Sequence, residues 1–115
     1  MKRGEIYWAN LNPRSGSEQY GKRPVIIVSH DVFNESFKWH SIIVVPVSAS
    51  NKQSRRGPTA IVLARGTAGL KQLSVALCHQ VTTLDRSKIN EKIGLLPSSS
   101  LYEVDQGLKI ALSLE

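Results

Sequence analysis

A carboxylate and a guanidinium lie five residues apart in the loop of residues 16–24, which reads GSEQYGKRP. Glu18 can accept a proton, and Arg23 can stabilise an anion that develops beside it. These two groups together suit the chemistry of a phosphate ester. The alternative interpretation is a surface ion pair on an ordinary hairpin loop, which would carry no chemistry.

The elements that must position this loop are predicted to be short strands. The loop leads into the apolar run of residues 25–28, which predicts a buried strand over 25–29, and Gly16 and Gly21 allow the tight backbone at its two ends. In the predicted strand 41–48, Pro46 indicates an edge or a bulge, because proline donates no ladder hydrogen bond. The other predicted strands span residues 6–11, 59–63, 73–83 and 92–96.

Two helical segments are predicted. Asp31 is the expected cap of a short helical turn over residues 31–37, and Ser100 with Glu103 fits a capping box. The apolar residues that follow share one helical face, so a C-terminal helix is predicted to cover an open side of the sheet. These residues are Leu101, Val104, Leu108, Ala111 and Leu112. The whole pattern predicts one mainly β domain over residues 1–115, a small bent sheet or barrel closed by a helix.

The positive charge of the chain is concentrated in its middle. The formal net charge is +6, and no Asp or Glu occurs between Ser36 and Leu84. This span predicts an electropositive surface for a polyanionic partner, although a solvated face is the simpler alternative. Its basic residues are Lys38, Lys52, Arg55, Arg56, Arg65 and Lys71.

Other features exclude several classes of protein. Cys78 is the only cysteine, so there is no disulfide framework, and a packed core thiol is its expected role. The N-terminal residues lack the apolar centre of a signal peptide, and no apolar run is long enough to span a membrane. We therefore expect a cytoplasmic protein without a membrane partner. His30, His40 and His79 are scattered and make a poor ligand set, so neither a metal nor another cofactor is predicted.

The chain resembles the MazF/PemK (Kid) family of toxins from bacterial type II toxin–antitoxin pairs. The resemblance rests on RGEIYW at residues 3–8, the loop of residues 16–24, QVTTLD at residues 80–85 and the C-terminal helix. It implies an SH3-like or CcdB-like barrel, a homodimer and metal-independent cleavage of single-stranded RNA at short sequences. The 2′-hydroxyl would attack the adjacent phosphorus and leave a 2′,3′-cyclic phosphate and a 5′-hydroxyl. An acidic antitoxin is the implied protein partner.

The resemblance also implies roles for individual residues. Arg23 occupies the position of the family's catalytic arginine, and Glu18 occupies the acidic position of the same loop. Ser48 stands where the family usually has a catalytic threonine, and serine lacks the methyl group that restricts the rotamer. Capping of a strand end is the alternative role of Ser48. Thr82 replaces a basic residue that many members carry.

Two sets of residues are predicted to contact RNA. Lys52, Arg55 and Arg56 form a basic loop suited to phosphates. Polar side chains suited to base edges are Ser17, Gln19, Ser74 and Gln80, each of which could instead be satisfied within the fold.

The sequence allows two rival functions. One is a noncatalytic RNA-binding barrel, in which Ser48 and Thr82 mark lost activity. The other is a topoisomerase poison of the CcdB type, whose toxic contact uses aromatic residues at the extreme C-terminus. The sequence disfavours the second, because this chain ends ALSLE.

Overall fold

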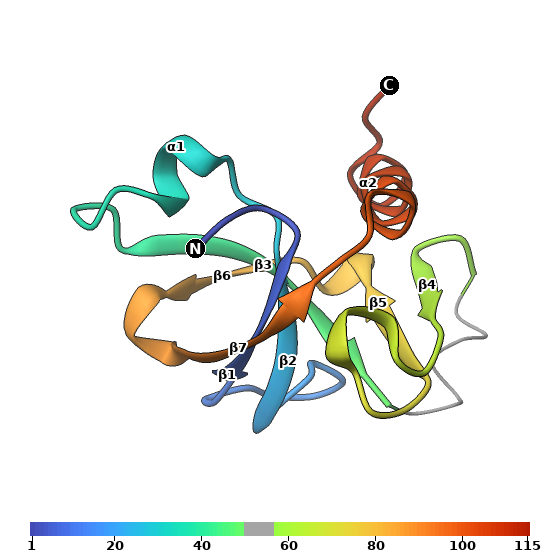
Figure 1. Cartoon of the computed structure of the whole chain (residues 1–115), viewed down its shortest axis with the longest axis horizontal. Helices are drawn as coiled ribbons and strands as arrows, with labels where there is room; N and C mark the ends of the chain where they lie inside the picture. Colours follow the sequence, from blue (N-terminus) through green and yellow to red (C-terminus); the bar gives the residue numbers. More distant parts are fainter. Residues whose placement is uncertain (50–56) are drawn as a thin grey trace.

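The computed structural model describes residues 1–49 and 57–115 of the chain. Seven strands and a C-terminal helix dominate it (Figure 1). The strands are β1 (Glu5–Asn10), β2 (Lys22–Ile27), β3 (Ser41–Ser48), β4 (Ala60–Leu63), β5 (Ser74–Leu77), β6 (Thr82–Asp85) and β7 (Ile89–Leu95). The helices are α1 (Asp31–Asn34) and α2 (Ser98–Leu112), with short 3₁₀ turns η2 (Thr67–Gly69), η3 (Cys78–Gln80) and η4 (Arg86–Lys88).

The strands form one antiparallel sheet in the order β4-β5-β3-β2-β1-β7, with β6 paired to β3 outside this path. In the described ranges, β4 and β7 end the order and do not pair with each other, so the sheet is barrel-like but not closed. The predicted mainly β fold with a C-terminal helix is confirmed. No helix in the described part of the chain has both the length and the apolar character needed to cross a membrane.

The central strands β2 and β3 are buried because both of their faces carry apolar side chains. One face contributes Ile26, Val45 and Val47 to a cluster that also contains Val104 of α2. The opposite face contributes Val25 and Val44 to a second cluster. Two buried faces explain why these strands appear in the sequence as continuous apolar runs rather than as an alternation.

Helix α2 covers the sheet beside β4 and η3, in agreement with the predicted covering role (Figure 1). The approach is close at Gly107, where an added Cβ would lie 2.7 Å from Sγ of Cys78. Cys78 is fully buried, and its thiol donates to the carbonyl of Val104 at 3.5 Å. The thiol is therefore a packed core group, and burial raises its pKa to about 11.

Two strand predictions need correction. The predicted strand 73–83 is two strands, β5 and β6, separated by the turn η3. Both pair with β3, β6 alongside Ser41–Val44 and β5 alongside Val47 and Ser48. Pro46 is therefore not on an edge strand, because it pairs with Val25 of β2 on one side. It lies where β3 changes its outer neighbour, so its missing N–H interrupts no continuous ladder.

Both predicted helix caps are wrong. At α1 the cap is His30, whose Nδ1 accepts from the backbone N–H of Val32 at 3.0 Å. The carboxylate of Asp31 instead accepts from the backbone N–H of Arg3. Helix α2 begins at Ser98, directly after Pro97, and no side chain caps it. The fixed φ of proline suits helix entry, so the chain turns before it reaches Ser100.

Candidate active site and nucleic-acid interface

The register of β2 and β3 brings Arg23 and Ser48 to the same end of the sheet. Val25 lies opposite Pro46 in the antiparallel pair, and Ile27 lies opposite Val44. The same register continued by two residues places Arg23 opposite Ser48, just beyond the last paired position. Opposite residues of a pair present their side chains on one face. By this register, Arg23 and Ser48 lie on one face and at one end of the two strands, although they are distant in the sequence.

Arg23 is held by its Nε atom alone. Nε donates to the carbonyl of Tyr20 at 3.0 Å, and the guanidinium carbon lies 5.8 Å from the centre of the Tyr20 ring. The two Nη groups make no hydrogen bond to any residue that the structure describes, and the side chain is half-buried. Arg23 therefore has a fixed base and a donor fork that a phosphate can occupy.

Ser48 ends β3 as a buried residue with 4% exposure. By the alternation of an extended strand it shares the face of Pro46 rather than that of Val47. Pro46 lines a hollow with the loop that carries Glu18, whereas Ser48 itself is not among the residues that line it.

Glu18 pairs with a different arginine from the one that its sequence position suggested. Oε2 of Glu18 lies 3.3 Å from Nη1 of Arg14, and Oε1 accepts from the Ser15 hydroxyl at 3.2 Å. The hydrogen bond from Arg14 is the main cause that lowers the pKa of the Glu18 carboxyl below its ordinary value. Sequence reasoning missed Arg14, although the spacing of four residues between opposite charges was a usable signal.

The side chain of Gln80 ties the loop to η3. Its Oε1 atom accepts from the backbone N–H of Gln19 at 2.8 Å, and its Nε2 atom donates to the carbonyl of Ser17 at 3.2 Å. Gly16 and Gly21, which bracket this segment, both have positive φ, as the predicted tight backbone requires. The amide of Gln80 is thus used within the fold, which leaves the side chains of Ser17 and Gln19 as the loop's polar edge.

The loop, η3 and β3 enclose a hollow of about 230 Å³. Arg14, Glu18 and Thr82 line one part of it, and Nη1 of Arg14 lies 3.4 Å from Oγ1 of Thr82. The remaining lining residues are Gln19, Pro46, His79, Gln80 and Val81. This hollow combines a carboxylate with a guanidinium on the face of β3 that carries Ser48.

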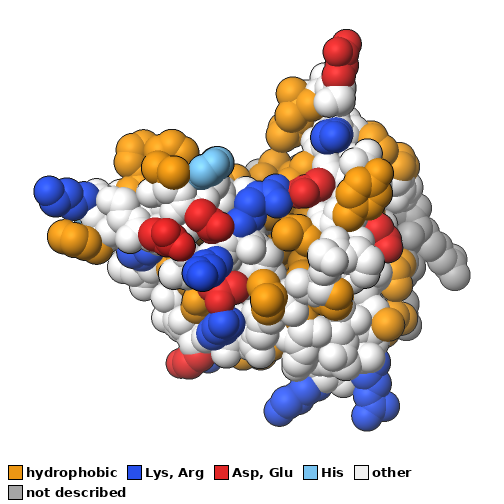
Figure 2. All heavy atoms as spheres, turned by 45° about the horizontal axis from the view of Figure 1, so that its top comes forward, with side chains coloured by type: hydrophobic (Ala, Val, Ile, Leu, Met, Phe, Trp, Pro, Cys, Tyr) orange, Lys and Arg blue, Asp and Glu red, His pale blue; other side chains and the backbone are white. Residues whose placement is uncertain are grey.

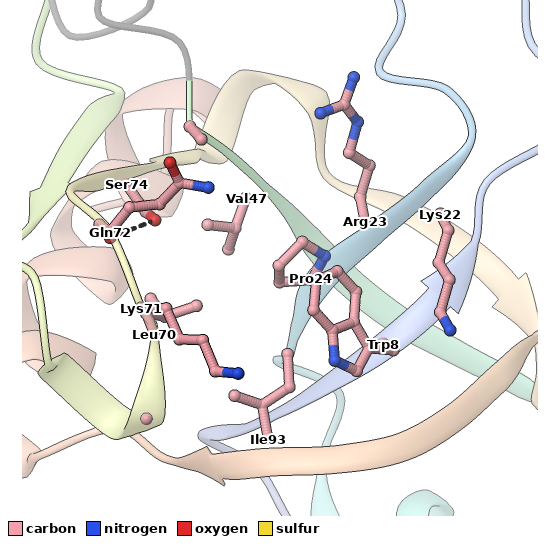
Figure 3. A pocket seen from close by; sticks show the side chains of 12 residues that line it. Trp8, Lys22, Arg23, Pro24, Val47, Leu70, Lys71, Gln72, Ser74 and Ile93 are labelled. Carbon is pink, nitrogen blue, oxygen red and sulfur yellow. Dashed lines mark hydrogen bonds between the residues drawn. The ribbon is translucent and has the colours of Figure 1, made fainter.

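A larger cavity of about 360 Å³ lies on the other side of β2 (Figure 3). Its wall contains the indole of Trp8, which is 37% exposed, with Nζ of Lys22 lying 5.7 Å from the ring centre. Lys71 and Gln72 face it from the segment before β5, and no carboxylate is among its described lining residues. Arg23 also lines this cavity, but Figure 3 shows its guanidinium directed away from the centre. An aromatic face beside lysine ammonium groups suits an unpaired nucleotide.

The remaining sequence candidates differ in their placement. Ser74 lines the larger cavity, but it is buried, and its hydroxyl donates to the carbonyl of Gln72 at 2.9 Å. Lys52, Arg55 and Arg56 lie outside the described residues. His79 contacts the Thr59 hydroxyl through Nδ1 at 3.3 Å. Within residues 1–49 and 57–115, no three His, Cys, Asp or Glu side chains gather as a metal site.

Charged side chains are mixed in sign on the face over α1 and α2. Figure 2 shows acidic and basic groups interleaved there, with apolar side chains gathered toward the α1 end. The exposed apolar residues of that region are Val32, Phe33, Phe37 and Trp39. Lys22, Arg23 and Lys71 occur together at the larger cavity, which has no carboxylate among its described lining residues.

Known proteins resemble this chain over nearly its full length. Residues 2–112 match the model of the PemK-like, MazF-like toxin of type II toxin–antitoxin systems. The curated endoribonuclease MazF of Staphylococcus epidermidis is 35% identical over 114 residues, which cover 99% of this chain and 92% of that protein.

Solved structures agree with this match. MazF from Deinococcus radiodurans (Form-I) has a TM-score of 0.82 at 25% identity. The match covers 99% of this chain and 97% of the MazF chain. The chain matched in a MazE–MazF structure (Form-II) from the same organism has a TM-score of 0.75 at 26% identity, with 100% and 97% coverage. The chain therefore belongs to the PemK-like, MazF-like toxin family of type II toxin–antitoxin systems, as its sequence motifs predicted.

Proposed function

We propose that this toxin is a sequence-selective, metal-independent endoribonuclease that cleaves single-stranded mRNA in the cytoplasm. The observation that carries the proposal is the β2–β3 register: continued from its last pair, Val25 with Pro46, it brings Arg23 and Ser48 to one end of the two strands. Glu18 lines a hollow with Pro46 at that end. The family match and the curated relative, itself an endoribonuclease, support the same activity.

The proposed reaction is an internal transfer at phosphorus. The 2′-oxygen forms a bond to the adjacent phosphorus as the bond to the 5′-oxygen breaks, which leaves a 2′,3′-cyclic phosphate and a 5′-hydroxyl. Glu18 takes the proton of the 2′-hydroxyl, because it is a carboxylate held in ionised form by Arg14. The leaving 5′-oxygen takes a proton from solvent, because a guanidinium barely deprotonates.

Arg23 and Ser48 stabilise the developing charge in this proposal. The Nη fork of Arg23 fits two phosphoryl oxygens, and its Nε contact with Tyr20 keeps the fork in place before the substrate arrives. The hydroxyl of Ser48 donates to the same phosphate from the neighbouring strand. Such prearranged donors do not need to reorganise during the reaction.

The proposed path of RNA on either side of the cleaved bond crosses the described surface. The larger cavity offers the Trp8 ring for a base and Lys22 and Lys71 for phosphates. Ser17 and Gln19 provide polar groups for base edges, whereas Ser74 is not proposed for this role, because it is buried and its hydroxyl donates to Gln72. The basic segment Lys52, Arg55 and Arg56 is proposed to hold the RNA backbone.

The proposed assembly is a homodimer that an acidic antitoxin inhibits. The chain resembles a MazF chain in a MazE–MazF structure at 26% identity. The acid-free lining of the larger cavity suits an acidic peptide as well as RNA, so an antitoxin tail can compete for the same cations.

One experiment tests the activity. The protein is incubated with a long single-stranded RNA in excess chelator, and the ends of the products are mapped. We expect 2′,3′-cyclic phosphate and 5′-hydroxyl ends at a short recurring sequence. Arg23→Ala should lower the yield of products by ~10²–10³, whereas Lys109→Ala, which changes an exposed lysine of α2 that lines neither cavity, should leave it unchanged.

Other outcomes would contradict the proposal in distinguishable ways. RNA binding without any cut would show a noncatalytic RNA-binding barrel. Inhibition of a topoisomerase with the RNA left intact would show a poison of the CcdB type. Cleavage that stops in chelator and returns with a divalent ion would contradict metal independence alone.

A further inference from the structure

Arg14 has no role in the proposal above except as the partner of Glu18, yet its guanidinium is held at three points. Nε donates to the carbonyl of Leu11 at 2.6 Å, at the end of β1. Nη1 donates to Oε2 of Glu18 at 3.3 Å and to Oγ1 of Thr82 at 3.4 Å. One side chain thus joins the end of β1, the loop and the first residue of β6.

The burial of the two partners differs in an informative way. The side chain of Arg14 is 15% exposed, whereas that of Glu18 is 51% exposed. A half-exposed carboxylate on a polar loop has several rotamers of similar energy, because solvent accepts it in each. The partly buried guanidinium is the fixed member of the pair, so it restricts the carboxylate rather than the reverse.

We propose that Arg14 is a positioning residue that holds the Glu18 carboxylate at the hollow between the loop and β6. Arg14 does not touch the reacting atoms. It acts through Glu18, by fixing the direction of the carboxylate and by favouring its charged form. This inference rests on the proposed role of Glu18 as the proton acceptor.

The ionisation of Glu18 has few other determinants in the described structure. Arg14 and Ser15 face it from its own loop, and His79 of η3 lines the same hollow. Arg14 is the largest contributor to the lowered pKa of Glu18. Loss of Arg14 should therefore raise that pKa toward the ordinary value, so that protonation inactivates the enzyme at a higher pH.

The test is a double-mutant cycle with Arg14→Ala, Glu18→Gln and the double variant, assayed on a single-stranded RNA oligonucleotide across acidic and neutral pH. We expect Arg14→Ala to lower kcat roughly tenfold, part of the ~10²–10⁴ that a general base supplies. The acid limb of its kcat profile should move to higher pH. The double variant should be no slower than Glu18→Gln alone, because both changes remove one function.

Three matched variants separate positioning from folding. Arg14→Lys keeps the charge and should return the acid limb toward its original pH. Lys109→Ala removes one positive charge from the exposed surface of α2 and should leave the limb in place. His79→Gln in the wild-type and Arg14→Ala backgrounds should leave the shift caused by Arg14 unchanged. Melting temperatures of all variants report whether each one folds.

Several results would overturn the inference. Multiplicative effects of Arg14→Ala and Glu18→Gln would place Arg14 directly on the phosphate, and a change in KM with an unmoved pH profile would do the same. If the wild-type protein cuts no RNA, the proposed function fails separately. Carboxyl NMR titration of Glu18 in the full chain then decides the inference, since an equal pKa with and without Arg14 contradicts it.

Discussion

Two long loops leave the sheet, residues 11–21 and residues 28–40, and side chains from the segment 80–86 hold both. Arg86 holds the second loop with five hydrogen bonds from its guanidinium to backbone carbonyls. The acceptors belong to Phe33, Asn34, Ser36 and Trp39. In the first loop this role belongs to the neutral amide of Gln80, and Arg23 donates only through Nε.

The difference separates an arginine whose donors are used within the fold from one that we propose to act on RNA. A guanidinium has five N–H donors, and the backbone occupies every donor nitrogen of Arg86. Arg86 consequently has no fork left for a phosphate. Both Nη groups of Arg23 make no hydrogen bond within the described residues, because the loop beside Arg23 is anchored by Gln80. The two arginines should therefore fail in opposite ways when they are removed.

The largest expected effect is on catalysis at Arg23. Arg23→Ala should lower kcat/KM for RNA cleavage by ~10²–10³, because it removes a prearranged donor to the developing charge. Its melting temperature should stay close to that of the wild type, because only one hydrogen bond is lost. Arg23→Lys retains the charge without the fork and should be intermediate. A folded, fully active Arg23→Ala variant would show that the Nη groups of Arg23 serve no catalytic role.

The next effect is on stability at Arg86. Arg86→Ala should lower the free energy of unfolding by about 2–3 kcal/mol, since several loop carbonyls lose a charged donor. Urea unfolding measures this change. The folded fraction should still cleave RNA at close to the wild-type rate. A stable but inactive Arg86→Ala would mean that the second loop serves the reaction.

A smaller effect is expected at Gln80, which anchors the catalytic loop. Gln80→Ala removes two hydrogen bonds, each of which stabilises the loop by about 1 kcal/mol. The loop should therefore become more mobile, and KM should rise roughly fivefold to tenfold. Hydrogen exchange at the Gln19 amide should accelerate. Gln80→Glu keeps the acceptor for that amide and should preserve its protection. Unchanged exchange in Gln80→Ala would show that the loop is held by other contacts.

The smallest effect is expected in the core beneath α2, which belongs to neither loop. Burial raises the pKa of Cys78 to about 11, so the thiol stays protonated, and therefore unreactive, at pH 8. Thiol reagents should label the native protein very slowly and the urea-unfolded protein at once. Cleavage activity should survive treatment of the native protein. Rapid labelling without unfolding would mean that α2 opens readily from η3.

Local sequence patterns predicted much of the fold, because they depend on neighbouring residues. The apolar runs of β2 and β3 mark buried strands at any register, and the 3.6-residue pattern of the final segment marks α2. Predictions that depend on which strand lies beside another in the sheet were less accurate. The split between β5 and β6 and the interior position of Pro46 both follow from which strand lies beside β3.

The sequence by itself determined the chemical groups available at the site and the family to which the chain belongs. Glu18 and Arg23 are recognisable from their loop, and the motifs around them identify the toxin family. The contacts that these groups make with one another and with the rest of the chain depend on the tertiary structure. Arg14 meets Thr82, and Gln80 holds the loop, because the sheet brings β6 and η3 beside residues 61 to 68 positions earlier in the chain. Such contacts depend on strand order and register, which no local pattern encodes.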